Sequence, residues 1–316
     1  MDIKQFTLKL TAYGSLLIAI IAFIGNILSF YIFSRKKFKK TIFSFYFRVE
    51  IVFNFLYLLM PINNYLEKEW NIHFKTISNL TCKLRYYYGD LTTPISNFIL
   101  AFVSIDRYLT IVYPKSFFSF RKNLSFKISS CLFLTIFNLI YYIPDLVLFG
   151  LDVQNNKTIN NETQILCYRK HEILNYLNFL NDAFIPFGIM TLFTILLLKS
   201  IYESRKRSRE LINVSSSQTS NKTKSRDIRF AITSISVNLV FIFSTLPLYF
   251  SFFLLSYHNQ IFIILDSFFM ILYYTKFGSM FFINYFTNSL FRNEFNSIIR
   301  FKVLNSNQNG LMFRST

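Results

Sequence analysis

The chain has 316 residues, of which 53% are hydrophobic, 20% are aromatic and only 16% are charged. A water-soluble protein of this length needs more charge to cover its surface, so the composition indicates a membrane protein. The formal net charge of +18 is typical of nucleic-acid-binding proteins, but the sequence contains no water-soluble domain with a basic face. We therefore attribute the excess of Lys and Arg to membrane topology and expect no nucleic-acid partner.

Seven stretches are long and apolar enough to cross a bilayer, which takes about 20 apolar residues. They lie at 11–34, 42–63, 82–112, 127–149, 175–200, 229–256 and 261–287. The first is too long for a cleaved signal peptide and has no small-residue cleavage site. We expect an all-α fold, a seven-transmembrane helix bundle over residues 11–287, preceded by an extracellular N-terminal segment at residues 1–10.

The orientation follows from the Lys and Arg residues of the loops, which accumulate on the cytosolic side of membrane proteins. One side of the predicted bundle has 22 of them and the opposite side has 9. The richer side includes the run RKKFKK at 35–40 and the segments between spans three and four and between spans five and six. We therefore expect a multi-pass protein of the plasma membrane with its N-terminus outside and its C-terminus inside.

The three cysteines agree with this topology. Cys82 opens the third span and Cys167 lies in the second outer loop, so both face an oxidising compartment in which a disulfide persists. Cys131 lies inside the fourth span, where we expect it to pack as an apolar residue. Sequons predict glycosylation at the outer sites Asn79, Asn156 and Asn161, whereas those at Asn123, Asn213 and Asn221 fall inside and are expected to be unused.

The end of the third span holds an acid and an arginine side by side, in the sequence Asp106-Arg107-Tyr108. With seven spans, an outer N-terminus and two outer cysteines, this motif resembles the rhodopsin-like (class A) family of G-protein-coupled receptors over about residues 10–302. In that family a disulfide cysteine lies twenty-five residues before the arginine, the same spacing as that between Cys82 and Arg107 here. A helix of that length covers about 37 Å, which is one membrane crossing.

Further matches to the family are distributed along the chain. Gly25-Asn26 is similar to the Gly-Asn pair of the family's first helix, and Pro186 and Pro247 stand where its fifth and sixth helices are kinked. Residues 288–302 carry apolar and polar side chains on opposite faces and look like the family's short amphipathic eighth helix on the inner leaflet. Residues 303–316 then form a cytoplasmic tail.

The chain departs from the family pattern at positions that usually form the activation switch. Asn54 stands where an acid usually binds sodium. Ser244 and Thr245 replace the Cys-Trp pair before the proline of span six, and Met280-Phe281 replaces Asn-Pro in span seven. These departures bear on regulated signalling and leave the expected fold unchanged.

The resemblance implies a role for the charges at the inner end of the bundle. Arg107 can pair with Asp106 beside it, and Asp227, twenty residues before Pro247, stands where the family often has an acid that holds this arginine. We interpret Arg107–Asp227 as a restraint that keeps spans three and six together at rest. Opening it exposes a crevice for a heterotrimeric G protein.

The outer half of the bundle is where a ligand is expected to bind. The candidate polar contacts are Asp90, Asp182, Lys276 and, at the start of span seven, Asp266. Lys276 could reach Asp90 across the bundle. Gly89 occupies the position at which amine receptors of the family have their acid, which disfavours an amine ligand. Lys276 is off the register of the retinal lysine of opsins, and the long outer loop around Cys167 favours a peptide.

Two other functions remain open. The missing switch residues allow a seven-helix receptor that binds a ligand without coupling to a G protein. A transporter or channel would need several ionisable groups along a path and broken or repeated helices, and the sequence shows no internal repeat. An enzyme is disfavoured because no histidine has metal-ligand spacing, and we predict neither a metal nor a cofactor.

Overall fold

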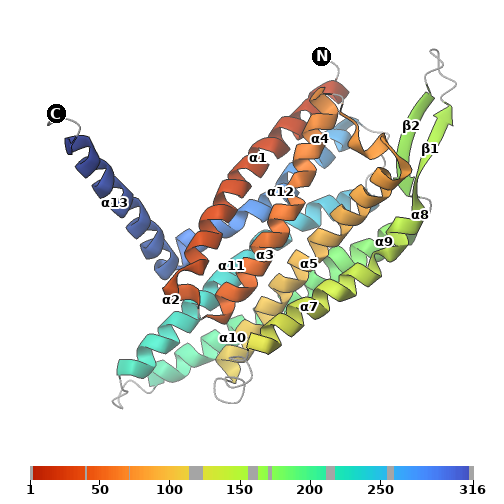
Figure 1. Ribbon diagram of the computed structural model, residues 1–316. Helices are drawn as coiled ribbons and strands as arrows, with labels where there is room; N and C mark the ends of the chain where they lie inside the picture. The colour runs from red at the N-terminus through yellow and green to blue at the C-terminus, as the bar shows by residue number, and fades with distance from the viewer. Residues whose placement is uncertain are drawn as a thin grey trace.

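A computed structural model describes residues 3–39, 41–70, 72–113, 124–155, 163–169, 173–210, 218–254 and 260–312. Long helices run along one another as an elongated bundle, with a β-hairpin at one end (Figure 1). We call the two ends the hairpin end and the α2 end. In chain order the elements are α1 (Ile3–Ser34), α2 (Lys36–Lys39), α3 (Ile42–Tyr57), α4 (Leu59–Trp70), η1 (Phe74–Thr76), α5 (Asn79–Val112), α7 (Leu124–Tyr141), α8 (Ile143–Leu148), β1 (Phe149–Asn155), β2 (Thr163–Arg169), α9 (Ile173–Phe179), η2 (Leu180–Phe184), α10 (Ile185–Glu210), α11 (Gln218–Leu254), α12 (Gln260–Thr287) and α13 (Ser289–Met312).

The predicted seven-helix bundle is confirmed. Six of the described helical stretches are long and apolar enough to cross a membrane, and α12, with 28 residues, completes the bundle between α1 and α11. Three spans are built from more than one element: α3 with α4, α7 with α8, and α9 with η2 and α10. Helix α1 begins at Ile3, inside the segment 1–10 that we expected to precede it, because this stretch has no Gly or Pro to stop a helix.

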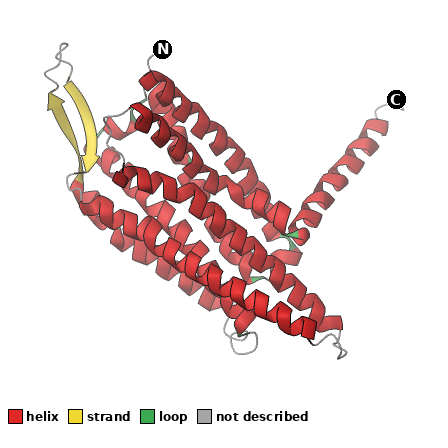
Figure 2. Cartoon of the chain, turned by 180° about the vertical axis from the view of Figure 1, so that it is seen from behind, coloured by secondary structure: helices red, strands yellow, loops and turns green. Residues whose placement is uncertain are grey.

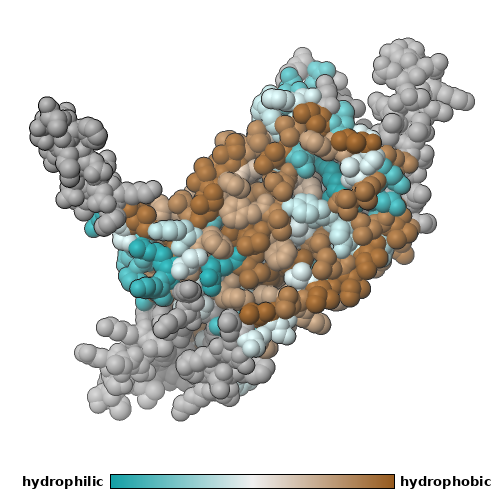
Figure 3. Space-filling view, in the orientation of Figure 1, coloured by the Kyte–Doolittle hydropathy of each residue, from teal (hydrophilic) through white to brown (hydrophobic). Residues whose placement is uncertain are grey.

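The outer surface of the bundle is apolar along much of its length (Figure 3). Leucine, isoleucine and phenylalanine side chains point away from the core on every long helix, including Leu17, Phe133, Leu192, Phe243 and Phe286, which are 54–70% exposed. Soluble monomers rarely expose so large an apolar surface to water. The surface therefore fits lipid, while the polar side chains inside the bundle form hydrogen bonds with one another.

Small residues bring α1 and α12 close together. A Cβ added at Gly278 would lie 2.8 Å from the Ala22 Cβ and 2.9 Å from its Cα, and one added at Gly25 would lie 3.2 Å from the Phe281 Cβ. Asn26 Nδ2, next to Gly25, donates to the Phe277 carbonyl oxygen at 2.9 Å. Such close backbone approach and interhelical hydrogen bonding are how helices associate in membranes, and they explain the Gly25-Asn26 pair in physical terms.

A β-hairpin covers the hairpin end of α5. Strands β1 and β2 pair antiparallel, with Leu151 opposite Cys167, and the Cys82–Cys167 disulfide, whose Cα atoms are 5.8 Å apart, ties the hairpin to the first turn of α5. The disulfide confirms the expected pairing, and Cys131 is free and buried as predicted. The strands themselves were not expected from the sequence.

At the α2 end, α13 leaves the bundle at an angle (Figure 2). Its first turns nevertheless pack on the other helices: Phe291 is fully buried with its ring 5.4 Å from that of Phe33. Glu294 forms ion pairs with Arg35, at 2.9 Å, and with Lys37. The helix extends from Ser289 to Met312, so it is longer than the predicted 288–302 and includes most of the predicted tail.

Candidate functional site

A cavity of about 720 Å³ opens among the helices in the half of the bundle nearer the hairpin. Eight of its nineteen lining residues are aromatic, and the lining comes from α3, α4, α5, the turn between α7 and α8, α9, η2, α11 and α12. The aromatic side chains in the lining are Tyr57, Tyr86, Tyr142, Tyr176, Phe179, Tyr249, Tyr273 and Tyr274. A pocket of this size with aromatic walls and a few polar groups is the usual form of a small-molecule or peptide-anchor site.

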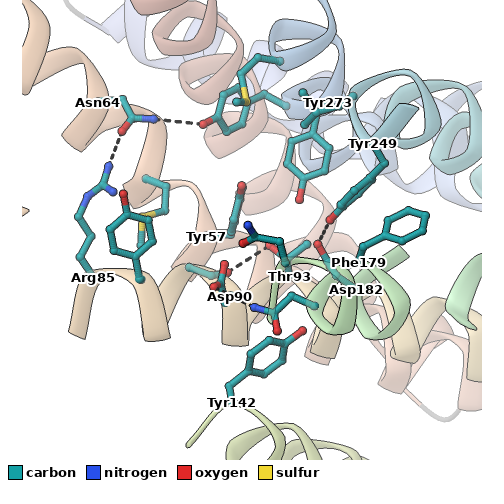
Figure 4. Close-up of a pocket in the computed structure, with 18 of the residues that line it drawn as sticks. Tyr57, Asn64, Arg85, Asp90, Thr93, Tyr142, Phe179, Asp182, Tyr249 and Tyr273 are labelled. Carbon is teal, nitrogen blue, oxygen red and sulfur yellow. Dashed lines mark hydrogen bonds between the residues drawn. The ribbon is translucent and has the colours of Figure 1, made fainter. Parts of the chain in front are cut away.

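The polar groups of the cavity lie at opposite sides (Figure 4). At one side Arg85 donates to the Asn64 Oδ1, and Asn64 Nδ2 donates to the Tyr274 hydroxyl at 3.3 Å. Asp182 lies toward the other side, and Asp90 lies between it and Arg85. The cavity is therefore electrostatically asymmetric, with a guanidinium at one side and a carboxylate at the other.

Asp182 is held in place by a break in helical geometry. It lies in the π-helical turn η2, just before Pro186, and Pro186 has no backbone N–H to donate to the carbonyl four residues earlier. That carbonyl belongs to Asp182, and Asn97 Nδ2 of α5 donates to it at 2.6 Å. The same nitrogen lies 2.9 Å from Asp182 Oδ1, and the Tyr249 hydroxyl of α11 donates to Oδ2. Pro186 thus frees a carbonyl that fixes the acid at the cavity wall.

Lys276 of α12 lies in the interior of the bundle and is linked to Asp182 through Asn97. Its side chain is 9% exposed, and its Nζ donates to the Asn97 Oδ1 at 3.4 Å. The ammonium also lies over aromatic rings, at 4.1 Å from the centroid of Tyr273 and 4.7 Å from that of Phe277. Such contacts stabilise a cation that has been taken out of water.

Asn97 links Lys276 to Asp182, because its Oδ1 accepts from the Lys276 ammonium and its Nδ2 donates to Asp182 Oδ1. The sequence suggested Asp90 as the partner of Lys276. Asp90 instead accepts a hydrogen bond from Asn178 Nδ2 at 3.2 Å. Asn178 also donates to Asp145 at 3.3 Å, so Asp90 belongs to a second polar group on the wall formed by α5, α8 and α9.

A separate group of buried polar side chains joins α3 to α5. Glu50 is 3% exposed, and its Oε1 accepts a hydrogen bond from Asn54 Nδ2 at 2.7 Å. Ser96 of α5 donates to the Asn54 Oδ1 at 2.8 Å. The predicted structural residue Asn54 thus joins α3 to α5, and the acid missing at its own position is found one helical turn earlier, at Glu50.

Arg107 lies buried in the half of the bundle nearer the α2 end, with 3% of its surface exposed. Its Nη2 donates to the Asp106 Oδ2 at 2.7 Å. Its guanidinium lies 5.1 Å from the ring centroid of Phe43 on α3 and 5.8 Å from that of Phe230 on α11. These two rings are 4.7 Å apart, so Arg107 and both rings form one cluster, which we call the arginine–aromatic cluster.

The remaining predicted residues at this end are placed as follows. Tyr108 packs edge-on against Phe193 of α10, with centroids 5.6 Å apart. Asp227 is in helix α11, but its side chain lies outside the described residues, as do Asn156 and Asn161. Asn79 is exposed in the first turn of α5, and its Oδ1 accepts a hydrogen bond from the Leu151 backbone nitrogen at 3.3 Å.

Several residues of these sites were missed by sequence reasoning. Glu50 is an ionisable residue inside the second predicted span, which is by itself a signal of function, so it could have been found. Asn97 and Phe230 carried no such signal, because an amide or a phenylalanine within a span is ordinary membrane-helix composition. Their importance depends on which helix faces them.

Comparison with known families gives one match. The family described as "7 transmembrane receptor (rhodopsin family)" matches residues 25–281, which is most of the bundle. No curated protein matches the chain. The matched region contains α3 to α11 and most of α12, and therefore both the cavity and the arginine–aromatic cluster.

Proposed function

Because this chain belongs to the rhodopsin family of seven-transmembrane receptors, we propose that it binds an extracellular ligand and activates a heterotrimeric G protein. The observation that carries this proposal is Arg107, a buried arginine in the half of the bundle opposite the cavity, held by Asp106 and by rings from two further helices. A buried charge is costly to keep. A buried arginine at this place is explained if its guanidinium contacts the G protein once the helices separate.

The cavity is our proposed ligand site. It lies beneath the hairpin end, where the disulfide holds a strand pair over α5, and its opposite sides carry opposite charges. A peptide segment supplies both kinds of partner, carboxylate and amine or guanidinium, on one backbone. We therefore favour a peptide over a singly charged lipid, which cannot pair with both Arg85 and Asp182.

The arginine–aromatic cluster is our proposed restraint on activation. It joins α5, α3 and α11 through Arg107, Phe43 and Phe230. We expect Asp227, three residues before Phe230 in the sequence, to add an ion pair to Arg107. Outward movement of α11 would separate Phe230 from Arg107. A ligand that favours this movement would shift the population toward the open state, in which Arg107 becomes accessible to the G protein.

We place the protein in the plasma membrane with the hairpin end outside. The sequence supports this orientation, with 22 Lys and Arg residues in the predicted inner segments against 9 in the predicted outer segments. The disulfide at the hairpin end supports it independently, because the outer compartment is oxidising.

The test is a peptide-library screen against cells that express the receptor with a promiscuous G protein as reporter. Peptides that activate the wild type should be silent on Arg107→Ala receptor present at the same surface density, yet should still bind it. Ligand-dependent binding without any G-protein activation would support a non-coupling receptor instead. Ion flux without nucleotide exchange would indicate a channel or transporter.

A further inference from the structure

The charged groups of the cavity differ in what already satisfies them. Both carboxylate oxygens of Asp182 accept hydrogen bonds from the protein, Oδ1 from Asn97 and Oδ2 from Tyr249. The Arg85 guanidinium has five N–H donors, and in the described part of the chain one hydrogen bond of this group is seen, from Nη2 to the Asn64 Oδ1. The guanidinium therefore keeps donors for a ligand, whereas the Asp182 carboxylate is held by the protein.

Arg85 is also a cation without a matching acid in the protein. None of the ion pairs found among the described residues involves it. The nearest acid in the sequence is Asp90, which is five residues and about 7.5 Å of helix rise away and accepts a hydrogen bond from Asn178. Arginine keeps its charge at any physiological pH. The counter-charge that would match Arg85 is therefore left to the ligand.

Two neighbours fix the direction of this guanidinium. Asn64 of α4 accepts from Arg85 through Oδ1 and donates through Nδ2 to the Tyr274 hydroxyl of α12 at 3.3 Å. The three side chains thus form one hydrogen-bonded group across three helices, and all three line the cavity (Figure 4). The Tyr274 hydroxyl accepts from Asn64, so its own proton remains to be donated. A group that is oriented before the ligand arrives loses less conformational entropy on binding.

We propose that the ligand of this receptor carries a carboxylate and binds it to the Arg85 guanidinium. The inference rests on the proposed function and names the chemistry of its ligand. A carboxylate accepts two parallel N–H bonds from a guanidinium, which adds direction to the attraction between the charges. Four N–H donors remain beside the one used for Asn64, so the ligand need not break the contact that orients Arg85.

The walls around Arg85 indicate what the carboxylate is attached to. Met60, Tyr86 and Tyr274 line the same cavity, and the Tyr274 ring lies 6.2 Å from that of Tyr57, centroid to centroid. These side chains suit an apolar or aromatic group next to the carboxylate. A group with several negative charges is disfavoured, because the acids of the cavity would repel the charge that Arg85 does not neutralise.

The test uses purified receptor in detergent or nanodiscs and two matched probes, 3-phenylpropanoate, which is anionic, and 3-phenylpropanamide, its neutral counterpart. Thermal unfolding is followed as each probe is titrated, since a ligand that binds the folded state raises the melting temperature with its concentration. The carboxylate should stabilise the wild type and the amide should not. The readout needs no G protein, so a receptor that fails to couple still tests this inference.

Three variants identify the group that binds the carboxylate. Arg85→Gln removes the charge and should weaken 3-phenylpropanoate by about tenfold or more, which corresponds to about 1.4 kcal/mol. Arg85→Lys keeps the charge but loses the planar fork, so its affinity should lie between those of Arg85→Gln and the wild type. Lys83→Gln removes a charge two residues earlier on α5, at a side chain outside the cavity lining, and should leave the affinity unchanged.

A third probe separates two sources of the carboxylate. N-Acetylphenylalanine has the ring and the carboxylate of 3-phenylpropanoate and adds an amide group, as at the end of a peptide. Tighter binding of N-acetylphenylalanine would assign the carboxylate to a peptide C-terminus, and equal binding would assign it to a free organic acid. Both results support a carboxylate at Arg85.

The inference is overturned if neither carboxylate raises the melting temperature of the wild type, or if the amide raises it as much as 3-phenylpropanoate does. It is also overturned if Arg85→Gln binds 3-phenylpropanoate as tightly as the wild type, or if Lys83→Gln weakens it to the same extent as Arg85→Gln. If Arg85→Gln is too unstable to purify, Arg85→Lys replaces it, and unchanged affinity in that variant counts against the inference.

Discussion

Replacing Phe230 with leucine should raise basal signalling. Leucine keeps an apolar side chain on α11 but removes the ring face that lies 5.8 Å from the Arg107 guanidinium. Cation–π contacts contribute about 0.5–1 kcal/mol at exposed sites and about 2 kcal/mol when desolvated. Arg107 is buried, but the ring lies near the upper distance for this contact, so we take about 1 kcal/mol. The lost contact between Phe230 and Phe43 acts in the same direction.

A loss of about 1 kcal/mol from the resting state alone raises a rarely populated active state about fivefold. The assay is basal nucleotide exchange on a G protein in membranes, at matched surface expression. The control is Phe243→Leu, the same substitution on the same helix at a side chain that is 70% exposed. It should leave basal exchange unchanged. Equal basal exchange in Phe230→Leu and wild type, in a receptor that does signal, would refute the proposed restraint.

Four further outcomes are expected. Cys82→Ser should reduce surface expression or ligand binding, because removing a native disulfide costs about 2–5 kcal/mol, whereas Cys131→Ser should have little effect. Mass spectrometry that finds Cys82 and Cys167 as free thiols would contradict this. Gly278→Ala should destabilise the receptor by about 1–3 kcal/mol, since the new Cβ would lie 2.8 Å from that of Ala22. Gly188→Ala should be tolerated, since nothing lies within 4 Å; thermal unfolding of the two variants decides. Glycosidase digestion should show glycan on Asn79, Asn156 or Asn161 and none on Asn213 or Asn221. The reverse pattern would indicate that the protein has the opposite orientation in the membrane. Asp227→Asn should raise basal exchange about tenfold if it removes about 1.4 kcal/mol from the resting state, and unchanged exchange would exclude the Arg107–Asp227 pair.

The sequence was sufficient to predict the bundle because bilayer physics leaves few choices. An apolar run of about 20 residues must be a helix, since no water is present to satisfy the backbone. The disulfide was predicted from the compartment expected for Cys82 and Cys167 and from the resemblance to the rhodopsin-like family, which the spacing between Cys82 and Arg107 matches. The β-hairpin was missed because its strands lie between two predicted spans, where no membrane constrains the chain and each strand is too short for its periodicity to be recognised.

The interior of the site was harder to predict, since it depends on which helices face one another. Lys276 and Asp182 stood out as charges inside spans, and both belong to the polar group at the cavity. Their connection through Asn97 could not be read from the sequence, because it depends on the carbonyl that Pro186 leaves free. In the same way Arg107 was predicted from its motif, but Phe43 and Phe230, which surround it, come from spans whose rotation the sequence leaves open.

The most direct test of the proposed function is nucleotide exchange on purified G proteins by the receptor in lipid nanodiscs, with wild type and Arg107→Ala side by side. The two proteins should bind a ligand of the cavity equally well, because the cavity and Arg107 are in opposite halves of the bundle. We expect the wild type to accelerate exchange on at least one G protein and Arg107→Ala to accelerate none. Acceleration of exchange by Arg107→Ala equal to that by wild type would contradict coupling through this arginine, and no acceleration by either protein on any G protein would favour a receptor that binds without coupling.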